Sequence, residues 1–99
     1  KLWKWLQSQP FYKNNTTLMV TTDHGRGEGH KWTSHGSSVA GADRVWLAVM
    51  GPDTPTGGEM RDHPKLFSNQ FAASISAFLG IDYNSIHPVG EIIESIIVK

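Results

Sequence analysis

The residues with the clearest capacity for chemistry are a carboxylate and an imidazole that stand side by side after a predicted strand. Asp23 and His24 directly follow the β-branched and apolar run 17–22, and Gly25 comes next. A third candidate, His35, follows a short loop later. Carboxylate oxygen and imidazole nitrogen together suit zinc, and also manganese or iron. The spacing therefore predicts a divalent-metal site at the end of this strand.

Each of these side chains also has a plainer interpretation. At an ordinary strand-end turn, Asp23 would accept backbone hydrogen bonds and His24 would be solvated. His35 would then be a loop histidine bonded to the backbone, and His30, in the same loop, competes with it as a ligand. The strand before the pair and the glycine after it favour Asp23, His24 and His35 as metal ligands, with His30 as the lesser candidate.

Other side chains in the same loop could face a substrate. Arg26 is the best suited to contact a substrate or to order the site, and His30 and Trp32 are further candidates. The three glycines of residues 25–29 could cradle a phosphate through backbone N–H groups. We favour the simpler interpretation, in which these glycines give the loop its turns.

These motifs occur in an order that resembles a known family. The strand ending in Thr-Thr-Asp-His-Gly, then a His-Gly and then a second strand, is similar to the C-terminal part of the alkaline phosphatase superfamily. That superfamily includes phosphatases, phosphodiesterases, cofactor-independent phosphoglycerate mutases and sulfatases. The closest likeness is to bacterial members with Thr-Asp-His-Gly-Arg-Gly, Trp-x-x-His-Gly, a Val-Trp-Leu-Ala-type strand and a closing helix. The matching residues here are 22–27, 32–36, 45–48, 69–75 and 79–81.

The resemblance implies a two-metal centre. It places Asp23 and His24 on the ion beside the nucleophile and His35 on the other ion, with zinc favoured and manganese as the alternative. An upstream serine or threonine would attack phosphorus in line, helped by the metal ions. The parent would then be a metal-dependent hydrolase of small phosphate or sulfate esters. The chain alone should be inactive, with its metal positions empty or partly filled.

Alternatives within and beyond the superfamily stay open. Sulfatases often carry Asp-Asn where this chain has Asp23-His24, so the histidine favours the two-metal branch. A phosphoglycerate-mutase-like phosphotransferase would use the same ligands. A degenerate relative that binds a partner without catalysis is the third interpretation, and the residues before Lys1 would discriminate all three.

Composition excludes several classes of partner. The chain has 99 residues, with nine Lys plus Arg balanced by nine Asp plus Glu, and it has no cysteine. Without a basic run, nucleic acid and anionic membranes are not expected partners. The apolar stretches are far shorter than the roughly 20 residues that span a membrane. The lack of cysteine excludes disulfides and thiolate metal sites but assigns no compartment, and a periplasmic or extracellular parent is only slightly favoured over a cytoplasmic one.

The start of the chain carries a further expectation. It opens at Lys1 without a methionine and without a charged-then-apolar leader, so we expect no signal peptide. Because family members are several times longer, we expect residues 1–99 to be the C-terminal segment of one catalytic domain.

Two strands are predicted. Residues 17–22 combine β-branched and apolar side chains in the pattern of a buried parallel strand. Residues 44–50 are apolar almost throughout, and Trp46 is expected in the core.

Three helices are predicted. Residues 2–7 would form one, with Trp3, Leu6 and Gln7 on one face and Pro10 ending it. Residues 91–98 repeat isoleucine at helical spacing, and we favour a helix there over a strand.

The most strongly indicated helix begins at Ser68, a good N-cap. Its apolar stripe would be Phe71, Ile75, Phe78 and Leu79, and Gly80 would end it in the left-handed conformation.

Strands joined by long excursions, with helices between them, indicate an α/β layer arrangement. The resemblance makes this the C-terminal part of an alkaline-phosphatase-like α/β/α sandwich with a mostly parallel sheet. Ligand sites in such sheets lie outside the carboxyl ends of the strands, where Asp23 and His24 fall. Strand edges and apolar faces left uncovered recruit other chains, so we expect self-association.

Overall fold

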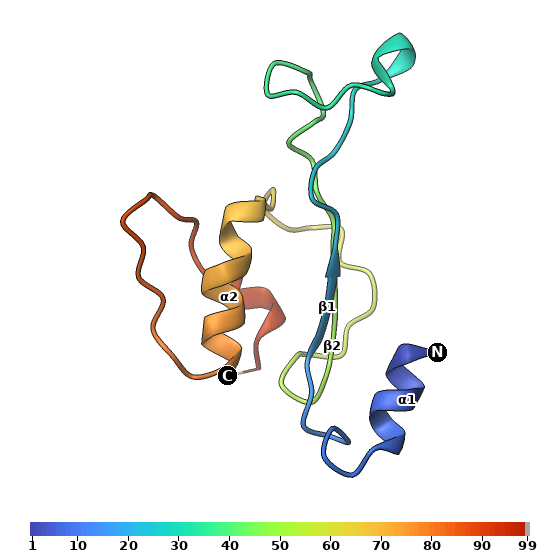
Figure 1. The fold of residues 1–99 in the computed structure, drawn as a ribbon, viewed down its shortest axis with the longest axis vertical. Coiled ribbons are helices and arrows are strands. Elements are labelled where there is room, and N and C mark those ends of the chain that lie inside the picture. The colour runs from blue at the N-terminus through green and yellow to red at the C-terminus, as the bar shows by residue number, and fades with distance from the viewer. Residues whose placement is uncertain (99) are drawn as a thin grey trace.

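A β-hairpin forms the axis of the computed structural model, which describes residues 1–98 (Figure 1). Strand β1 (Leu18–Thr21) pairs with β2 (Leu47–Met50), and Leu18 faces Met50 while Thr21 faces Leu47. Both strands are shorter than predicted because the ladder stops where residues 22–46 leave the hairpin. This long excursion carries all the candidate site residues.

The two strands are antiparallel, so the parallel pairing predicted for residues 17–22 is wrong for this pair. The reason lies in residues 22–46, which hold their own backbone hydrogen bonds as they run out and back. A segment that folds back on itself returns the chain beside its starting point, and that geometry requires an antiparallel neighbour. Helices and a sheet in one chain agree with the mixed α/β class.

Helix α1 (Leu2–Ser8) and helix α2 (Phe71–Phe78) lie near the residues predicted for them. In α1, the predicted face of Trp3, Leu6 and Gln7 is the half-buried one. Gly80 ends α2 with φ of +70°, the left-handed conformation expected there, and Ile81 N–H donates to the Ser76 carbonyl at 3.0 Å. The termination signal of this helix was therefore read correctly.

The start and the buried face of α2 differ from the prediction. A 3₁₀ turn, Ser68–Gln70, precedes the helix, so Ser68 is not the N-cap of α2 that was predicted. The capping bond at this turn comes from the Gln70 side chain, which accepts the Phe67 N–H at 2.8 Å. The buried side chains are Ala73, Ser74 and Ser76, while the predicted core residue Ile75 is 46% exposed. Small side chains face inward because another segment of the same polypeptide passes close to the helix.

That segment is the C-terminal one, and it does not form the helix predicted for residues 91–98. Only Glu94–Ile96 forms a 3₁₀ turn. Ile93, which is buried, donates its N–H to the Ser74 hydroxyl at 2.9 Å, and Thr54 donates its hydroxyl to the Ile96 carbonyl. β-branched residues favour extended chain, and these contacts hold the segment between α2 and the loop after β2.

The molecule is elongated and has little core. It measures 48 × 35 × 24 Å, with a radius of gyration of 15.7 Å, whereas a compact domain of this length has about 13 Å. Its accessible surface is 7802 Å², compared with about 5,600 Å² for an ordinary folded protein of 11.0 kDa. Among residues 1–98, the buried hydrophobic side chains are Ala42, Ala73 and Ile93.

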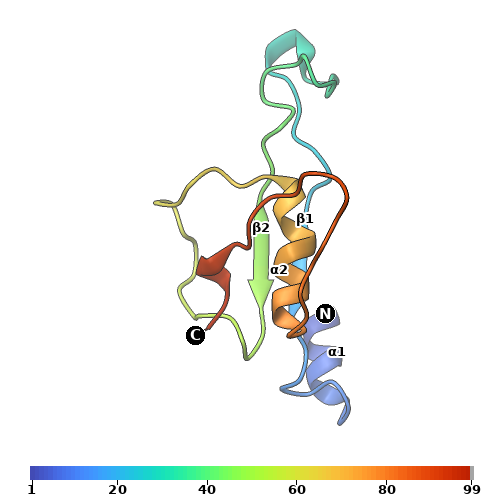
Figure 2. The same ribbon diagram turned by 90° about the vertical axis from the view of Figure 1, so that its left-hand side faces the viewer.

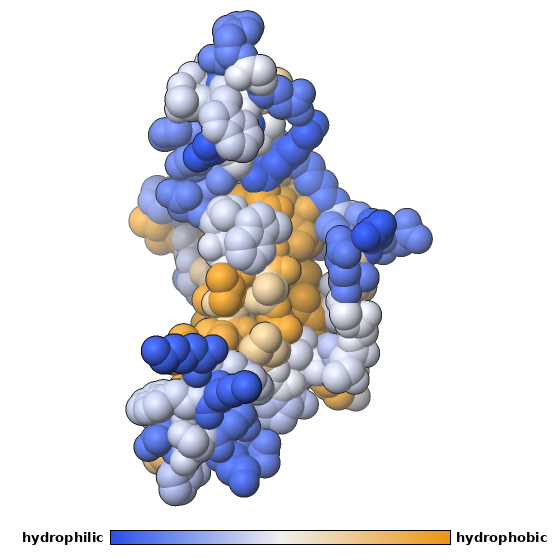
Figure 3. Space-filling view, turned by 90° about the vertical axis from the view of Figure 1, so that its right-hand side faces the viewer, coloured by the Kyte–Doolittle hydropathy of each residue, from blue (hydrophilic) through white to orange (hydrophobic). Residues whose placement is uncertain are grey.

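One face of the hairpin is uncovered. Helix α2 lies along the other face (Figures 1 and 2), and the view from the opposite side shows an apolar patch over the strands (Figure 3). Trp46, predicted to be in the core, is 53% exposed here. We call this the open sheet face, and from the alternation and register it consists of Leu18, Val20, Trp46, Ala48 and Met50.

We expect the chain to self-associate through the open sheet face, because contiguous apolar patches of this kind usually find a partner. Light scattering at tens of micromolar should show dimers or larger species. Val20→Lys should shift the distribution toward monomer, since it places a charge at the centre of the face. Ile86→Lys is the matched control, because Ile86 lies on a loop and is 95% exposed. A clean monomer at that concentration would contradict the prediction.

Within residues 1–98, no helix combines the length and the apolar character that crossing a membrane requires.

Candidate functional site

The excursion 22–46 is a tied loop. At its base, the Thr21 hydroxyl donates to the Trp46 carbonyl at 2.6 Å. Further out, Gly25 N–H donates to the Ala42 carbonyl at 2.8 Å and Gly27 N–H to the Ser34 carbonyl at 2.9 Å. These bonds hold the outgoing and returning chains side by side, which brings residues 23–27 next to residues 34–35.

Two glycines make this close approach possible. A Cβ atom on Gly25 would lie 2.2 Å from the Gly41 carbonyl oxygen, and one on Gly27 would lie 2.5 Å from the Lys31 carbonyl oxygen. Both distances are far shorter than any real contact, so only glycine fits. The same two N–H groups are engaged by carbonyls, so the idea that residues 25–29 cradle a phosphate through them is not supported.

Asp23 and His24 lie just beyond the end of β1, as predicted. One Asp23 carboxylate oxygen accepts the His24 backbone N–H at 2.9 Å. The His24 ring nitrogen Nδ1 lies 2.6 Å from the Gly25 carbonyl oxygen. Because a carbonyl only accepts, Nδ1 must carry the hydrogen, and in the neutral ring Nε2 then presents its lone pair.

The other ring nitrogen, Nε2, lies near a carboxylate oxygen. His24 Nε2 and Asp23 Oδ2 are 3.5 Å apart. Two ligands at about 2.1 Å from one tetrahedral zinc ion would be separated by about 3.4 Å. The pair therefore has the spacing of two ligands on one ion. Asp23 is well exposed and His24 about one-third exposed, so an ion could reach them from solvent.

His35 is brought to the same place. Its ring stacks on the His24 ring, with the centroids 4.0 Å apart and the planes inclined by 13°. In parallel rings the nitrogen lone pairs point in parallel planes, so the two imidazoles do not converge on one ion.

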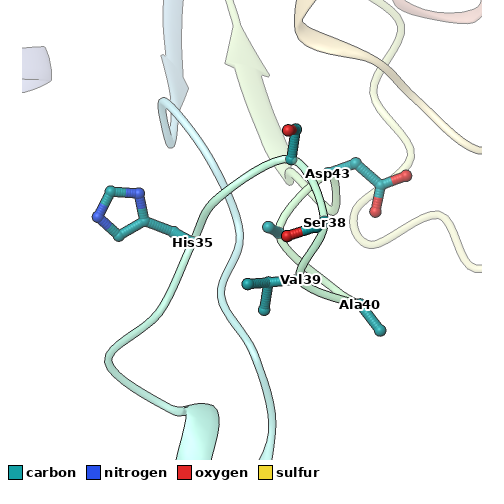
Figure 4. Close-up of a pocket in the computed structure, with 7 residues that line it drawn as sticks. His35, Ser38, Val39, Ala40 and Asp43 are labelled. Atoms are coloured by element: carbon teal, nitrogen blue, oxygen red, sulfur yellow. The ribbon is translucent and has the colours of Figure 1, made fainter.

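Across residues 1–98, no three histidine, aspartate or glutamate side chains are placed to hold one ion together. Asp43 is the other nearby carboxylate, and it accepts a hydrogen bond from Lys65. This bond lowers the pKa of the Asp43 carboxyl from its usual value of 3.8. Figure 4 shows the His35 ring and the Asp43 carboxylate on opposite sides of the chain, so Asp43 does not join the histidine pair.

The three residues considered for substrate contact have different surroundings. His30 lies exposed in the 3₁₀ turn Gly29–Lys31. The Arg26 guanidinium lies over the Trp32 ring, 4.4 Å from its centroid. No sequence pattern indicated this contact, because the fold of the loop creates it.

Of the candidate site residues, only His35 lines either of two hollows on the surface. A shallow one of about 430 Å³ is lined by His35 and the turn 37–43 (Figure 4). A larger apolar one of about 960 Å³ lies between β2, the loop 54–66 and residues 91–96. Asp23 and His24 line neither of these two hollows.

Compared with protein-family models, with curated proteins and with solved structures, the chain showed no match.

Proposed function

We propose that this chain supplies metal ligands to a metal-dependent hydrolase of phosphate or sulfate esters. Asp23 and His24 would hold one ion and His35 a second. The observation that carries the proposal is the paired geometry: donor atoms of Asp23 and His24 at 3.5 Å, with the His35 ring stacked at 4.0 Å. The ordered motifs that resemble the alkaline phosphatase superfamily support the same assignment.

The donor set fits the group that the resemblance implies. One oxygen and two imidazole nitrogens suit zinc best, with manganese as the alternative. When bound, two such ions would stabilise the attacking and leaving oxygens of a displacement. The chain's own part is to fix the ligands: the Gly25 carbonyl sets the His24 tautomer, and the ties of the loop hold His35 against it.

In this proposal the nucleophile comes from a segment outside these residues, so the chain alone is inactive. The α/β/α sandwich with a mostly parallel sheet is also part of the proposal. Such a sandwich would need further strands paired to the open edges of the two-stranded sheet. A phosphoglycerate-mutase-like phosphotransferase would use the same three ligands. A binding protein without catalysis would keep the fold and lose the need for them.

Zinc titration of the chain tests the ligand assignment. We expect weak binding at neutral pH, because zinc sites normally carry three or four protein ligands. Calorimetry should show a further loss in Asp23→Ala and in His24→Ala, and ¹⁵N spectra should show zinc at His24 Nε2. His30→Ala is the matched control and should bind as the unaltered chain does.

Two results would contradict the assignment. Equal losses in His30→Ala and His24→Ala would mean that zinc binds wherever a histidine is exposed. Submicromolar affinity that requires both Asp23 and His35 would mean that one complete site exists, in place of two partial ones.

A further inference from the structure

Arg26 is the one arginine without a carboxylate partner among residues 1–98. Arg44 pairs with Glu28 at 3.5 Å and Arg61 with Glu59 at 3.2 Å, whereas the Arg26 guanidinium lies over the Trp32 ring. An aromatic face attracts the cation without using its N–H groups in the plane. The five donors of Arg26 are thus left free for an anion.

The backbone around Arg26 is fixed on both sides. Gly25 is tied to Ala42 and Gly27 to Ser34 by the hydrogen bonds described above. The Arg26 carbonyl oxygen lies close under Gly41, only 2.7 Å from where a Cβ on that glycine would stand. A side chain on so constrained a backbone, stacked on a tryptophan, has lost much of the freedom that an exposed arginine normally keeps.

Arg26 is also close to the histidine pair along the chain. Two residues of chain span at most about 7 Å, and His24 is two residues away. The outgoing and returning chains are held together both where His24 stacks on His35 and where Gly27 bonds to Ser34. Arg26 lies between these two points.

We propose that Arg26, held by Trp32, binds the tetrahedral oxyanion of the substrate through two of its non-bridging oxygens. Guanidinium donors form a rigid fork that matches two oxygens of a phosphate or sulfate group. The inference rests on the proposed function only in identifying this anion with the ester group that is hydrolysed. Anion binding by Arg26 itself needs no metal.

The test uses inorganic phosphate as the probe and ¹⁹F spectra of the chain labelled with 5-fluorotryptophan. The chain has four tryptophans, and Trp32→Phe assigns the signal of interest. Phosphate should shift the Trp32 signal, sulfate should do so comparably, and chloride at equal ionic strength should not. Arg26→Gln should weaken phosphate binding at least about tenfold, because a charge-assisted pair of bonds is lost. The phosphate affinity of Arg26→Lys should lie between those of the unaltered chain and Arg26→Gln, since lysine keeps the charge but not the forked pair of donors.

Arg44→Gln is the matched control, because Arg44 is exposed, lies in the same loop and already has a carboxylate partner. Equal losses in Arg44→Gln and Arg26→Gln, or an equal response to chloride, would overturn the inference. Zinc binding measured without phosphate separates the two proposals. Phosphate binding that depends on Arg26 in a chain that binds no zinc would keep this inference and remove the proposed function. Zinc binding with phosphate indifferent to Arg26 would do the reverse.

Discussion

Under the proposed function, replacing Asp23 or His24 by alanine in a metal-dependent ester hydrolase that contains this chain should lower the turnover of the ester by about 100-fold or more. Removing a residue that only orients a metal ligand already lowers metal affinity or activity about 10- to 100-fold. Asp23 and His24 are proposed as ligands themselves, so the loss should be larger. Hydrolysis of p-nitrophenyl phosphate, its bis ester and the sulfate would measure the effect and indicate the ester preferred. The isolated 99-residue chain should hydrolyse none of them above background.

The matched controls are His30→Ala and Asp43→Asn. His30 is exposed in the same loop, and Asp43 is turned away toward Lys65. Both variants should keep turnover within a few fold. Turnover near that of the unaltered protein in both Asp23→Ala and His24→Ala would remove the pair from the mechanism. Phosphoryl transfer between substrate positions, without net hydrolysis, would favour the mutase-like alternative.

The sequence predicted the neighbourhood of the site better than the fold that produces it. A β-rich run followed by Asp-His-Gly located Asp23 and His24 at a strand end, and the loop does return His35 to them. That placement was predicted for parallel strands, whose carboxyl ends share one edge of a sheet. In the antiparallel hairpin, the end of β1 instead meets the start of β2, because Thr21 faces Leu47. The site therefore arises from a loop that folds back.

The helix predicted for residues 91–98 from the spacing of isoleucines is wrong because β-branched residues favour extended chain. The errors at Trp46 and Ile75 have another physical cause, because both residues were predicted to be covered from their apolar character. A pattern of apolar residues indicates which surfaces favour burial, but it does not indicate which neighbouring segment is present to cover them. Here Trp46 is exposed on the open sheet face, and Ser74 takes the buried position that bonds Ile93. By contrast, the end of α2 was predicted correctly because Gly80 acts through its own backbone geometry.

Gly25→Ala should disrupt the site without touching a ligand. The added methyl would stand 2.2 Å from the Gly41 carbonyl oxygen and 2.5 Å from that of Arg44. These are backbone atoms, which cannot rotate away as a flexible side chain could. Relief requires the outgoing and returning chains to separate, which breaks the Gly25–Ala42 hydrogen bond. Overpacking of this kind costs about 1–3 kcal/mol.

The separation should be visible at the histidine pair. Once the chains move apart, the His35 ring loses the position against His24 that Gly25 and Gly27 create for it. Amide exchange at residue 25 should accelerate, nuclear Overhauser contacts between the two imidazoles should vanish, and zinc binding should weaken.

Gly36→Ala is the control, because Gly36 adjoins His35 and a Cβ there would have no atom within 4 Å. It should change the free energy of unfolding by no more than about 0.5 kcal/mol. If Gly25→Ala kept both the imidazole contacts and the slow exchange, the ties of the loop would not be what positions His35. The stacking of the two rings would then have to be stable by itself, which a single pair of exposed side chains does not usually achieve.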